Sequence, residues 1–162
     1  MDIQTLAETL GQRLVMRGLM LSTAESCTGG WIAQAVTDIP GSSQWFDRGF
    51  VTYSNDAKQD MLGVSSEVLG TYGAVSEQTV REMVQGALER SGAQIAVAVS
   101  GIAGPGGGSI EKPVGLVWIA WALKQGATTA QAAHFSGSRR EIRRQSVKTA
   151  LQGLLDLVAS TE

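Results

Sequence analysis

Residues 22–30 read Ser-Thr-Ala-Glu-Ser-Cys-Thr-Gly-Gly, with an apolar run at 19–21 before them and an amphipathic stretch at 31–36 after them. This pattern predicts a buried strand that turns sharply into a helix. A hydroxyl at such a turn stands at the rim of a sheet, where the first N–H groups of the helix have no intrahelical acceptor and the helix dipole favours negative charge. We therefore predict a nucleophile, Ser26, beside an oxyanion site. The alternative is that Ser26 or Thr28 only caps the helix.

Strands and helices alternate along the rest of the chain. Helices are predicted at 3–17, 28–38, 55–62, 65–72, 76–90 and 138–158, and strands at 19–24, 45–54, 94–99, 115–123 and 127–135. The strand at 94–99 is almost continuously apolar, which is typical of a strand buried on both faces. Helices before, between and after strands predict an α/β fold, a layered α/β/α domain with a mixed central sheet, and we expect a single domain over residues 1–162.

The composition excludes several classes of protein. The chain has 162 residues, of which 43% are apolar and 17% charged, as in an ordinary soluble domain. A net charge of −2 argues against nucleic-acid binding. The N-terminus lacks the pattern of a signal peptide, no apolar run is long enough to cross a membrane, and a lone cysteine fits a reducing compartment, so we expect a cytoplasmic protein. One cysteine and one histidine, His134, leave almost no basis for a zinc site.

A candidate base lies in residues 50–58, where Tyr53 ends a predicted strand and Lys58 follows in a short helix. A free lysine has a pKa near 10.4, but burial can lower it to about 7–8, where it takes a proton from serine. Ser–Lys pairs are known nucleophilic systems. The alternatives are a solvated lysine and a core tyrosine. Cys27 is a second candidate nucleophile, ranked below Ser26 because no histidine partner is evident.

Two further stretches suggest an anion site. The glycine-rich loop 100–109 follows a buried strand, and its N–H groups could approach a phosphate or carboxylate, although it lacks the Gly-Lys-Ser/Thr ending of a Walker loop. The alternative is a plain flexible loop. The last helix begins with four arginines, at a position where the dipole disfavours cations unless an anion lies nearby. Arg139 and Arg143 share one helical face and Arg140 and Arg144 another, so one pair could clamp a phosphate. The alternative is a solvated basic face.

Taken together, these motifs resemble the C-terminal domain family of CinA, the competence/damage-inducible protein. The matching blocks are Thr-Ala-Glu-Ser-Cys-Thr-Gly-Gly at 23–30, Gly-Phe-Val-Thr-Tyr-Ser-Asn-Asp-Ala-Lys at 49–58, Gly-Ala-Val-Ser-Glu at 73–77, Ser-Gly-Ile-Ala-Gly-Pro-Gly-Gly-Gly at 100–108, Lys-Pro-Val-Gly at 112–115 and Phe-Ser-Gly at 135–137. They cover almost the whole chain in order. The resemblance implies hydrolysis of the carboxamide of nicotinamide mononucleotide to nicotinate mononucleotide and ammonia, without a metal or cofactor.

The resemblance also implies roles for individual residues. It implies Ser26 as the nucleophile, activated by Lys58 with help from Tyr53. The expected oxyanion donors are the N–H groups of Cys27, Thr28 and Gly29, and the expected substrate-binding residues are Ser100, Gly101, Gly104, Arg139 and Arg143. Two other functions stay open: a non-catalytic nucleotide-binding module, and an amidase for another small amide.

A homodimer is expected from two tryptophans in the strand predicted at 115–123. Trp118 and Trp121 are three residues apart and therefore lie on opposite faces of that strand. One of them could belong to the core and the other to an interface between subunits.

Overall fold

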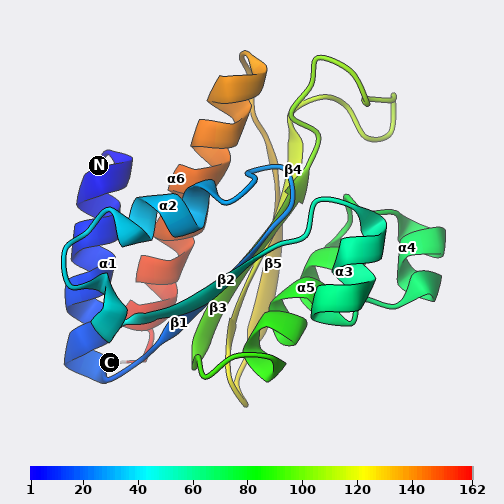
Figure 1. Cartoon of the computed structure of the whole chain (residues 1–162). Coiled ribbons are helices and arrows are strands. Elements are labelled where there is room, and N and C mark those ends of the chain that lie inside the picture. The colour runs from blue at the N-terminus through cyan, green and yellow to red at the C-terminus, as the bar shows by residue number, and fades with distance from the viewer. Residues whose placement is uncertain (162) are drawn as a thin grey trace.

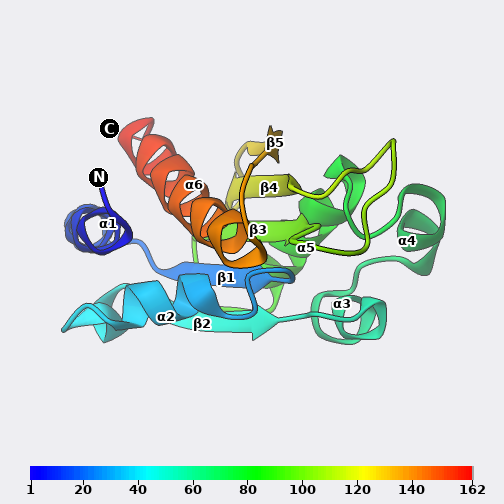
Figure 2. The ribbon, with the colours of Figure 1, turned by 90° about the horizontal axis from the view of Figure 1, so that it is seen from above.

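The computed structural model describes residues 1–161, in which a five-stranded sheet lies between two layers of helices (Figures 1 and 2). The strands are β1 (Leu21–Glu25), β2 (Phe46–Val51), β3 (Ile95–Gly101), β4 (Leu116–Leu123) and β5 (Thr128–His134). The helices are α1 (Ile3–Arg17), α2 (Trp31–Thr37), α3 (Asn55–Leu62), α4 (Ser66–Tyr72), α5 (Glu77–Glu89) and α6 (Arg139–Ala159), with a 3₁₀ turn at Ser42–Gln44.

The strand order is β2-β1-β3-β4-β5. The first three strands of this order are parallel, and β4 and β5 run antiparallel to their neighbours, which confirms the predicted mixed sheet. Glu25, the last residue of β1, pairs with Val51 on one side and Val99 on the other. The chain therefore leaves all three parallel strands at the same edge of the sheet. The next two strands along the chain, β2 and β3, lie on opposite sides of β1. Such an edge is where α/β sheets bind ligands.

Two hydrophobic cores cover the two faces of the sheet. Helices α1, α2 and α6 pack on one face and α3, α4 and α5 on the other (Figure 2). Along β3, Val97 belongs to the first core and its neighbours Ala96 and Ala98 to the second. The small alanines allow α5 to pack closely on the sheet. All three residues are fully buried, as predicted for a strand covered on both sides.

The two tryptophans of β4 lie on opposite faces, as predicted. Trp121 is buried in the core under α6, and its Nε1 donates to the Ala150 carbonyl at 2.9 Å. Trp118 is partly buried and packs against the core under α5. Both rings therefore serve the protein's own cores, so neither tryptophan argues for a subunit interface, and a homodimer stays a prediction.

One predicted element begins later than expected. The helix predicted from residue 28 starts at Trp31, because Gly29 and Gly30 have φ angles of 61° and 102°. These left-handed conformations suit glycine and interrupt the helix. In the described part of the chain, no helix is both long and apolar enough to span a membrane.

Candidate active site

Ser26 and Lys58 meet at the carboxyl edge of the parallel strands. Ser26 directly follows β1, and Lys58 lies in the first turn of α3, which follows β2. The Lys58 Nζ is 3.1 Å from the Ser26 Oγ. Ser26 is 7% exposed and Lys58 only 1%, so the pair is shielded from water. The structure therefore joins two residues that the sequence singled out separately.

The surroundings of Lys58 favour an uncharged amine. Its Nζ donates to the carbonyls of Thr52 and Tyr53 at 3.0 and 3.1 Å. Burial lowers the Lys58 pKa from its ordinary value of 10.5. The Ser26 Oγ is the third oxygen within hydrogen-bond distance of Nζ, and a neutral amine that keeps its two N–H groups on the carbonyls would turn its lone pair to Oγ. This arrangement suits an amine that accepts the serine proton.

Glu25 holds the turn that follows Ser26, a role that the sequence interpretation missed. Its buried carboxylate accepts hydrogen bonds from the Thr28 hydroxyl at 2.6 Å and from the N–H groups of Ile32 and Ala33 at 2.8 and 3.1 Å. Burial raises the Glu25 pKa, and these hydrogen bonds act against that rise. Glu25 thus fills the capping role considered for Ser26 and Thr28. The sequence signal for this role is a glutamate that lies a few residues before two glycines and the start of a helix.

The N–H groups of the turn differ in their availability. The Gly29 N–H donates to the Ser26 carbonyl at 3.0 Å, so the geometry does not match the predicted role of Gly29 as an oxyanion donor. This hydrogen bond lies within the turn, because the helix begins only at Trp31. The N–H groups of Cys27 and Thr28 form no hydrogen bond with another described residue. Cys27 lines the cavity beside Ser26, whereas Thr28 is fully buried and outside that lining. Both N–H groups remain candidate oxyanion donors.

Tyr53 contributes its main chain to the Ser26–Lys58 pair, whereas its hydroxyl lies elsewhere. The hydroxyl accepts from the Arg139 Nη2 at 3.4 Å, and the side chain is 64% exposed at the rim of the site. No hydrogen bond among residues 1–161 connects this hydroxyl to Ser26 or Lys58. The predicted proton relay through the phenol is therefore not matched by this geometry, because the strand end directs the carbonyl of Tyr53, rather than its ring, toward the lysine.

The two arginines predicted to bind substrate are separated by the structure. Arg139 begins α6 and lines the cavity beside Ser26, where its Nη1 donates to the Gly104 carbonyl at 2.7 Å. Arg143 does not line that cavity. Its Nε and Nη2 donate to the carbonyls of Cys27 and Thr28 at 3.0 and 3.2 Å. Arg139 and Arg143 lie one helical turn apart. Arg139 lines the cavity, whereas Arg143 contacts the main chain of the turn that follows Ser26.

The glycine-rich loop forms part of the cavity wall. Ser100 and Gly101 end β3, and both line the cavity together with Gly104. The loop is tethered at its far side by Lys112, whose Nζ donates to the Tyr72 carbonyl at the end of α4. This contact could not be predicted from the sequence, because forty residues separate Tyr72 and Lys112 in the chain.

The cavity that holds these groups has a volume of about 290 Å³. Its lining residues are Ser26, Cys27, Tyr53, Asn55, Lys58, Ala74, Val75, Ser100, Gly101, Ile102, Ala103, Gly104, Gly106, Gly107 and Arg139. Arg139 is the permanently charged side chain in this lining, which contains no carboxylate. A small anionic ligand fits this charge pattern.

Cys27 also lines the cavity, but it is a poor nucleophile. Its thiol is buried, and burial raises the Cys27 pKa to about 11. Because the thiolate is the reactive form, this environment argues for Ser26 over Cys27. Among residues 1–161, no cluster of three or more His, Cys, Asp or Glu side chains could hold a metal ion.

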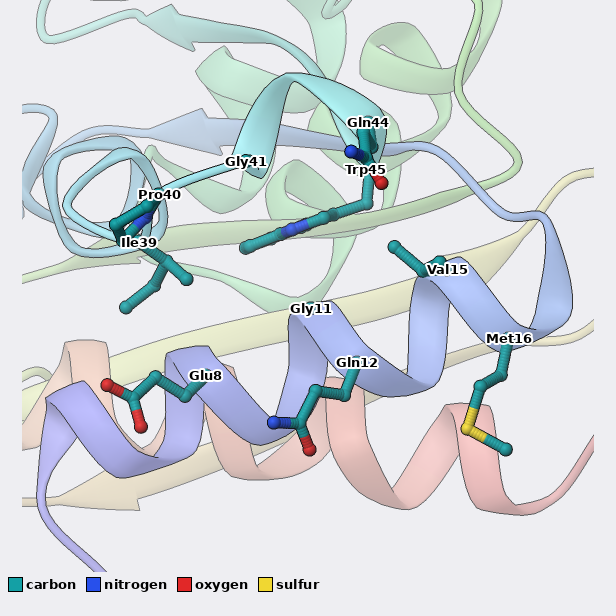
Figure 3. Close-up of a pocket in the computed structure, with 10 residues that line it drawn as sticks. All are labelled: Glu8, Gly11, Gln12, Val15, Met16, Ile39, Pro40, Gly41, Gln44 and Trp45. Carbon is teal, nitrogen blue, oxygen red and sulfur yellow. The ribbon is translucent and has the colours of Figure 1, made fainter.

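A larger cavity, of about 600 Å³, lies between α1 and the segment 39–45 (Figure 3). Its floor includes Trp45, whose ring lies over Gly11 of α1 (Figure 3). Glu8 is the one titratable side chain in its lining. The groove offers no paired nucleophile and base, so the smaller cavity beside Ser26 is the candidate active site.

Comparison with known proteins shows the family of the chain. The CinA C-terminal domain family matches residues 3–158. The chain is 55% identical over 153 residues to the nicotinamide-nucleotide amidohydrolase PncC of Escherichia coli (strain K12), covering 94% of this chain and 93% of that protein. It is 52% identical over 155 residues to the protein of the same name from Pseudomonas putida, covering 96% of each.

A solved structure shares the fold over nearly the whole chain. The crystal structure of the competence/damage inducible protein CihA from Agrobacterium tumefaciens superposes with a TM-score of 0.95 at 56% identity, over 97% of this chain and 96% of that one. The family match, the identities and the common fold agree with the resemblance found in the sequence motifs. The chain is therefore an amidohydrolase and belongs to the CinA C-terminal domain family.

Proposed function

We propose that the protein hydrolyses the carboxamide of nicotinamide mononucleotide to nicotinate mononucleotide and ammonia, with Ser26 as nucleophile and Lys58 as base. The observation that carries this proposal is the 3.1 Å approach of the Lys58 Nζ to the Ser26 Oγ in a site shielded from water. The names of the relatives from Escherichia coli and Pseudomonas putida support the substrate.

The first half of the reaction forms an acyl-enzyme. Neutral Lys58 takes the Ser26 proton while Oγ attacks the carboxamide carbon, and the carbonyl oxygen becomes an oxyanion. The N–H groups of Cys27 and Thr28 stabilise this oxyanion, and one such donor typically contributes about 3–4 kcal/mol. The Lys58 ammonium then returns its proton to the amide nitrogen. The carbon–nitrogen bond breaks and ammonia leaves, so that a nicotinate ester remains on Ser26 and the lysine is neutral again.

The second half hydrolyses the ester. Lys58 takes a proton from a water molecule, whose oxygen attacks the ester carbon and forms a second oxyanion at the same N–H groups. Collapse of this intermediate breaks the bond to Ser26, and Lys58 returns the proton to Oγ. Nicotinate mononucleotide leaves. The carbonyls of Thr52 and Tyr53 keep the amine oriented through both halves, because they stay bonded to its N–H groups.

The cationic lining supports a nucleotide substrate. Arg139 lines the same cavity as Ser26 and Lys58, and together with the N–H groups of the glycine-rich loop it would bind the 5′-phosphate. Ser100 is buried beside Gly101, and its hydroxyl would hydrogen-bond the substrate. The reaction would take place in a single domain, without a cofactor, in the cytoplasm.

An ammonia-release assay over pyridine nucleotides and simple amides tests this function. We expect ammonia from nicotinamide mononucleotide, and no ammonia from that substrate with Ser26→Ala. Cys27→Ala is the matched control, and it should keep kcat within a few-fold because its thiol is protonated. Saturable nucleotide binding without ammonia would instead favour a non-catalytic module. Activity confined to simple amides would favour a different amidase.

A further inference from the structure

Arg143 is bound to the main chain on the far side of the proposed oxyanion donors. Its Nε donates to the Cys27 carbonyl at 3.0 Å and its Nη2 to the Thr28 carbonyl at 3.2 Å. The Thr28 carbonyl also accepts from the Trp31 N–H at 3.0 Å. Among residues 1–161, Arg143 is the one hydrogen-bond donor to the Cys27 carbonyl. The orientation of the peptide between Cys27 and Thr28 therefore depends on this guanidinium.

The geometry of a peptide bond links that contact to the active site. In a trans peptide the C=O and the following N–H point in opposite directions. Because the Cys27 carbonyl points at Arg143, the Thr28 N–H points away from it. This N–H forms no hydrogen bond with another described residue, and Thr28 itself is fully buried next to Cys27, which lines the cavity. Gly29 and Gly30, both in left-handed conformations, give the turn little stiffness of its own.

The guanidinium is itself held in place. Its carbon lies 5.5 Å from the centre of the Trp31 ring, a cation–π distance. Arg140 stacks on the same ring at 5.1 Å but donates no hydrogen bond to the turn. Two arginines of α6 thus share one aromatic contact, and only Arg143 also contacts the main chain next to Ser26.

We propose that Arg143 is a positioning residue that keeps the Thr28 N–H directed at the developing oxyanion. The proposal rests on the proposed function and changes the role that the sequence suggested for Arg143, from phosphate ligand to support of the oxyanion site. Arg143 acts through the peptide and contacts no substrate. Arg139, which lines the cavity, remains the candidate phosphate ligand.

The test compares Arg143→Met with Arg140→Met in the full chain. Loss of one oxyanion donor typically lowers kcat about 10²–10³-fold. We expect Arg143→Met to lower kcat about 100-fold for nicotinamide mononucleotide, with KM changed less than about threefold. Arg140→Met should change both constants less than about twofold, because it removes the Trp31 contact and leaves the turn contacts. Added guanidinium ion should partly restore kcat in Arg143→Met alone.

Two further measurements separate positioning from phosphate binding and from loss of folding. In a Ser26→Ala background, Arg143→Met should leave the Kd of nicotinamide mononucleotide unchanged, whereas loss of a phosphate ligand would raise it. Amide hydrogen exchange over residues 26–31 should become faster in Arg143→Met and stay unchanged in Arg140→Met. If Arg143→Met fails to fold, Arg143→Lys decides: it should fold and lose about tenfold in kcat, because an ammonium cannot contact both carbonyls with the geometry of a planar guanidinium.

The outcomes distinguish this proposal from the proposed function. A wild-type protein that releases no ammonia from any pyridine nucleotide overturns the function and, with it, the catalytic meaning of Arg143. An active wild type whose Arg143→Met or Arg143→Lys variant keeps full kcat overturns the positioning role alone. If Arg143→Met raises the Kd of nicotinamide mononucleotide in the Ser26→Ala background, the positioning role is also overturned, and Arg143 is a substrate ligand instead.

Discussion

The amine of Lys58 lies 3.1 Å from the hydroxyl of Ser26, although thirty-two residues separate them in the chain. β1 and β2 are adjacent parallel strands, so their carboxyl ends bring the two residues to one edge of the sheet. Two backbone carbonyls lie around the same amine, so a neutral lysine that donates to both would present its lone pair to the serine. The pair is the centre of the proposed chemistry.

Replacing Lys58 by arginine should remove activity while keeping a long basic side chain at this position. Guanidinium stays protonated and cannot accept the Ser26 proton, so we expect kcat to fall about 10²–10⁴-fold, the usual contribution of a general base. In the wild type, kcat/KM should rise with pH through the Lys58 pKa, which burial holds below the ordinary lysine value, and then reach a plateau. A pH series of initial rates checks both statements. A Lys58→Arg enzyme with wild-type kcat would exclude lysine as the base.

Lys58 should also make stability depend on pH. Because its folded pKa is lowered, the unfolded chain binds more protons than the folded chain between the folded pKa and the ordinary lysine pKa. The free energy of unfolding should therefore rise with pH in that window, by at most about 1.4 kcal/mol per pH unit. Denaturant unfolding of wild type and Lys58→Met over a pH series measures it. The difference between the two proteins isolates Lys58, and a difference that is flat with pH would show that its pKa is not lowered.

Variants of Tyr53 separate the role of its main-chain carbonyl from the role of its side chain. Its carbonyl contacts Lys58, whereas its hydroxyl contacts Arg139. We expect Tyr53→Phe to keep kcat within about threefold, since removing an exposed hydroxyl hydrogen bond usually changes the free energy by less than about 1 kcal/mol. Tyr53→Ala should raise KM, because the ring forms part of the cavity rim. Steady-state rates of both variants decide, and a loss of more than 100-fold in Tyr53→Phe would restore the phenol as a proton relay.

Lys112 tethers the glycine-rich loop to the end of α4 through the Tyr72 carbonyl. The loop and residues 74–75 form facing parts of the cavity lining. Lys112→Ala should loosen that wall and raise KM about tenfold with kcat unchanged, which corresponds to about 1.4 kcal/mol of substrate binding. Lys124→Ala, in the exposed turn between β4 and β5, makes the same change of charge away from the cavity and should have no effect. Equal KM values for the two variants would show that the tether does not shape the site.

Two helical glycines should respond to alanine in opposite directions. A Cβ on Gly86 of α5 would lie 2.1 Å from the Leu62 carbonyl oxygen, whereas a Cβ on Gly70 of α4 meets nothing within 4 Å. Alanine has the higher helix propensity, by about 1 kcal/mol. Gly70→Ala should therefore stabilise by up to that amount. Gly86→Ala should destabilise by about 1–3 kcal/mol, because the backbone of α3 must move. Thermal unfolding of both variants checks the pair, and a stabilising Gly86→Ala would contradict the close packing of α3 and α5.

The sequence was sufficient to predict the bounds of helices whose ends are set by neighbouring residues. The helices at 3–17 and 55–62 have the predicted bounds. Each begins after a side-chain cap, Asp2 or Ser54, and ends at a glycine with a left-handed φ. Such signals act within one turn of helix, so they can be recognised without knowing the fold. The start of α2 was missed because the conformations of Gly29 and Gly30 belong to the turn that Glu25 holds.

The sequence by itself determined the order of strands and helices, the buried β3, and the four motifs that meet at the site, because apolar periodicity and motif spelling are properties of short stretches. Only the tertiary structure decided which groups face one another. Arg143 is 116 residues from Cys27 in the chain, and the Tyr53 hydroxyl is hydrogen-bonded to Arg139 rather than to Lys58. Side-chain roles of this kind depend on how separate elements pack across the sheet, and that packing is not encoded in the spacing of any one motif.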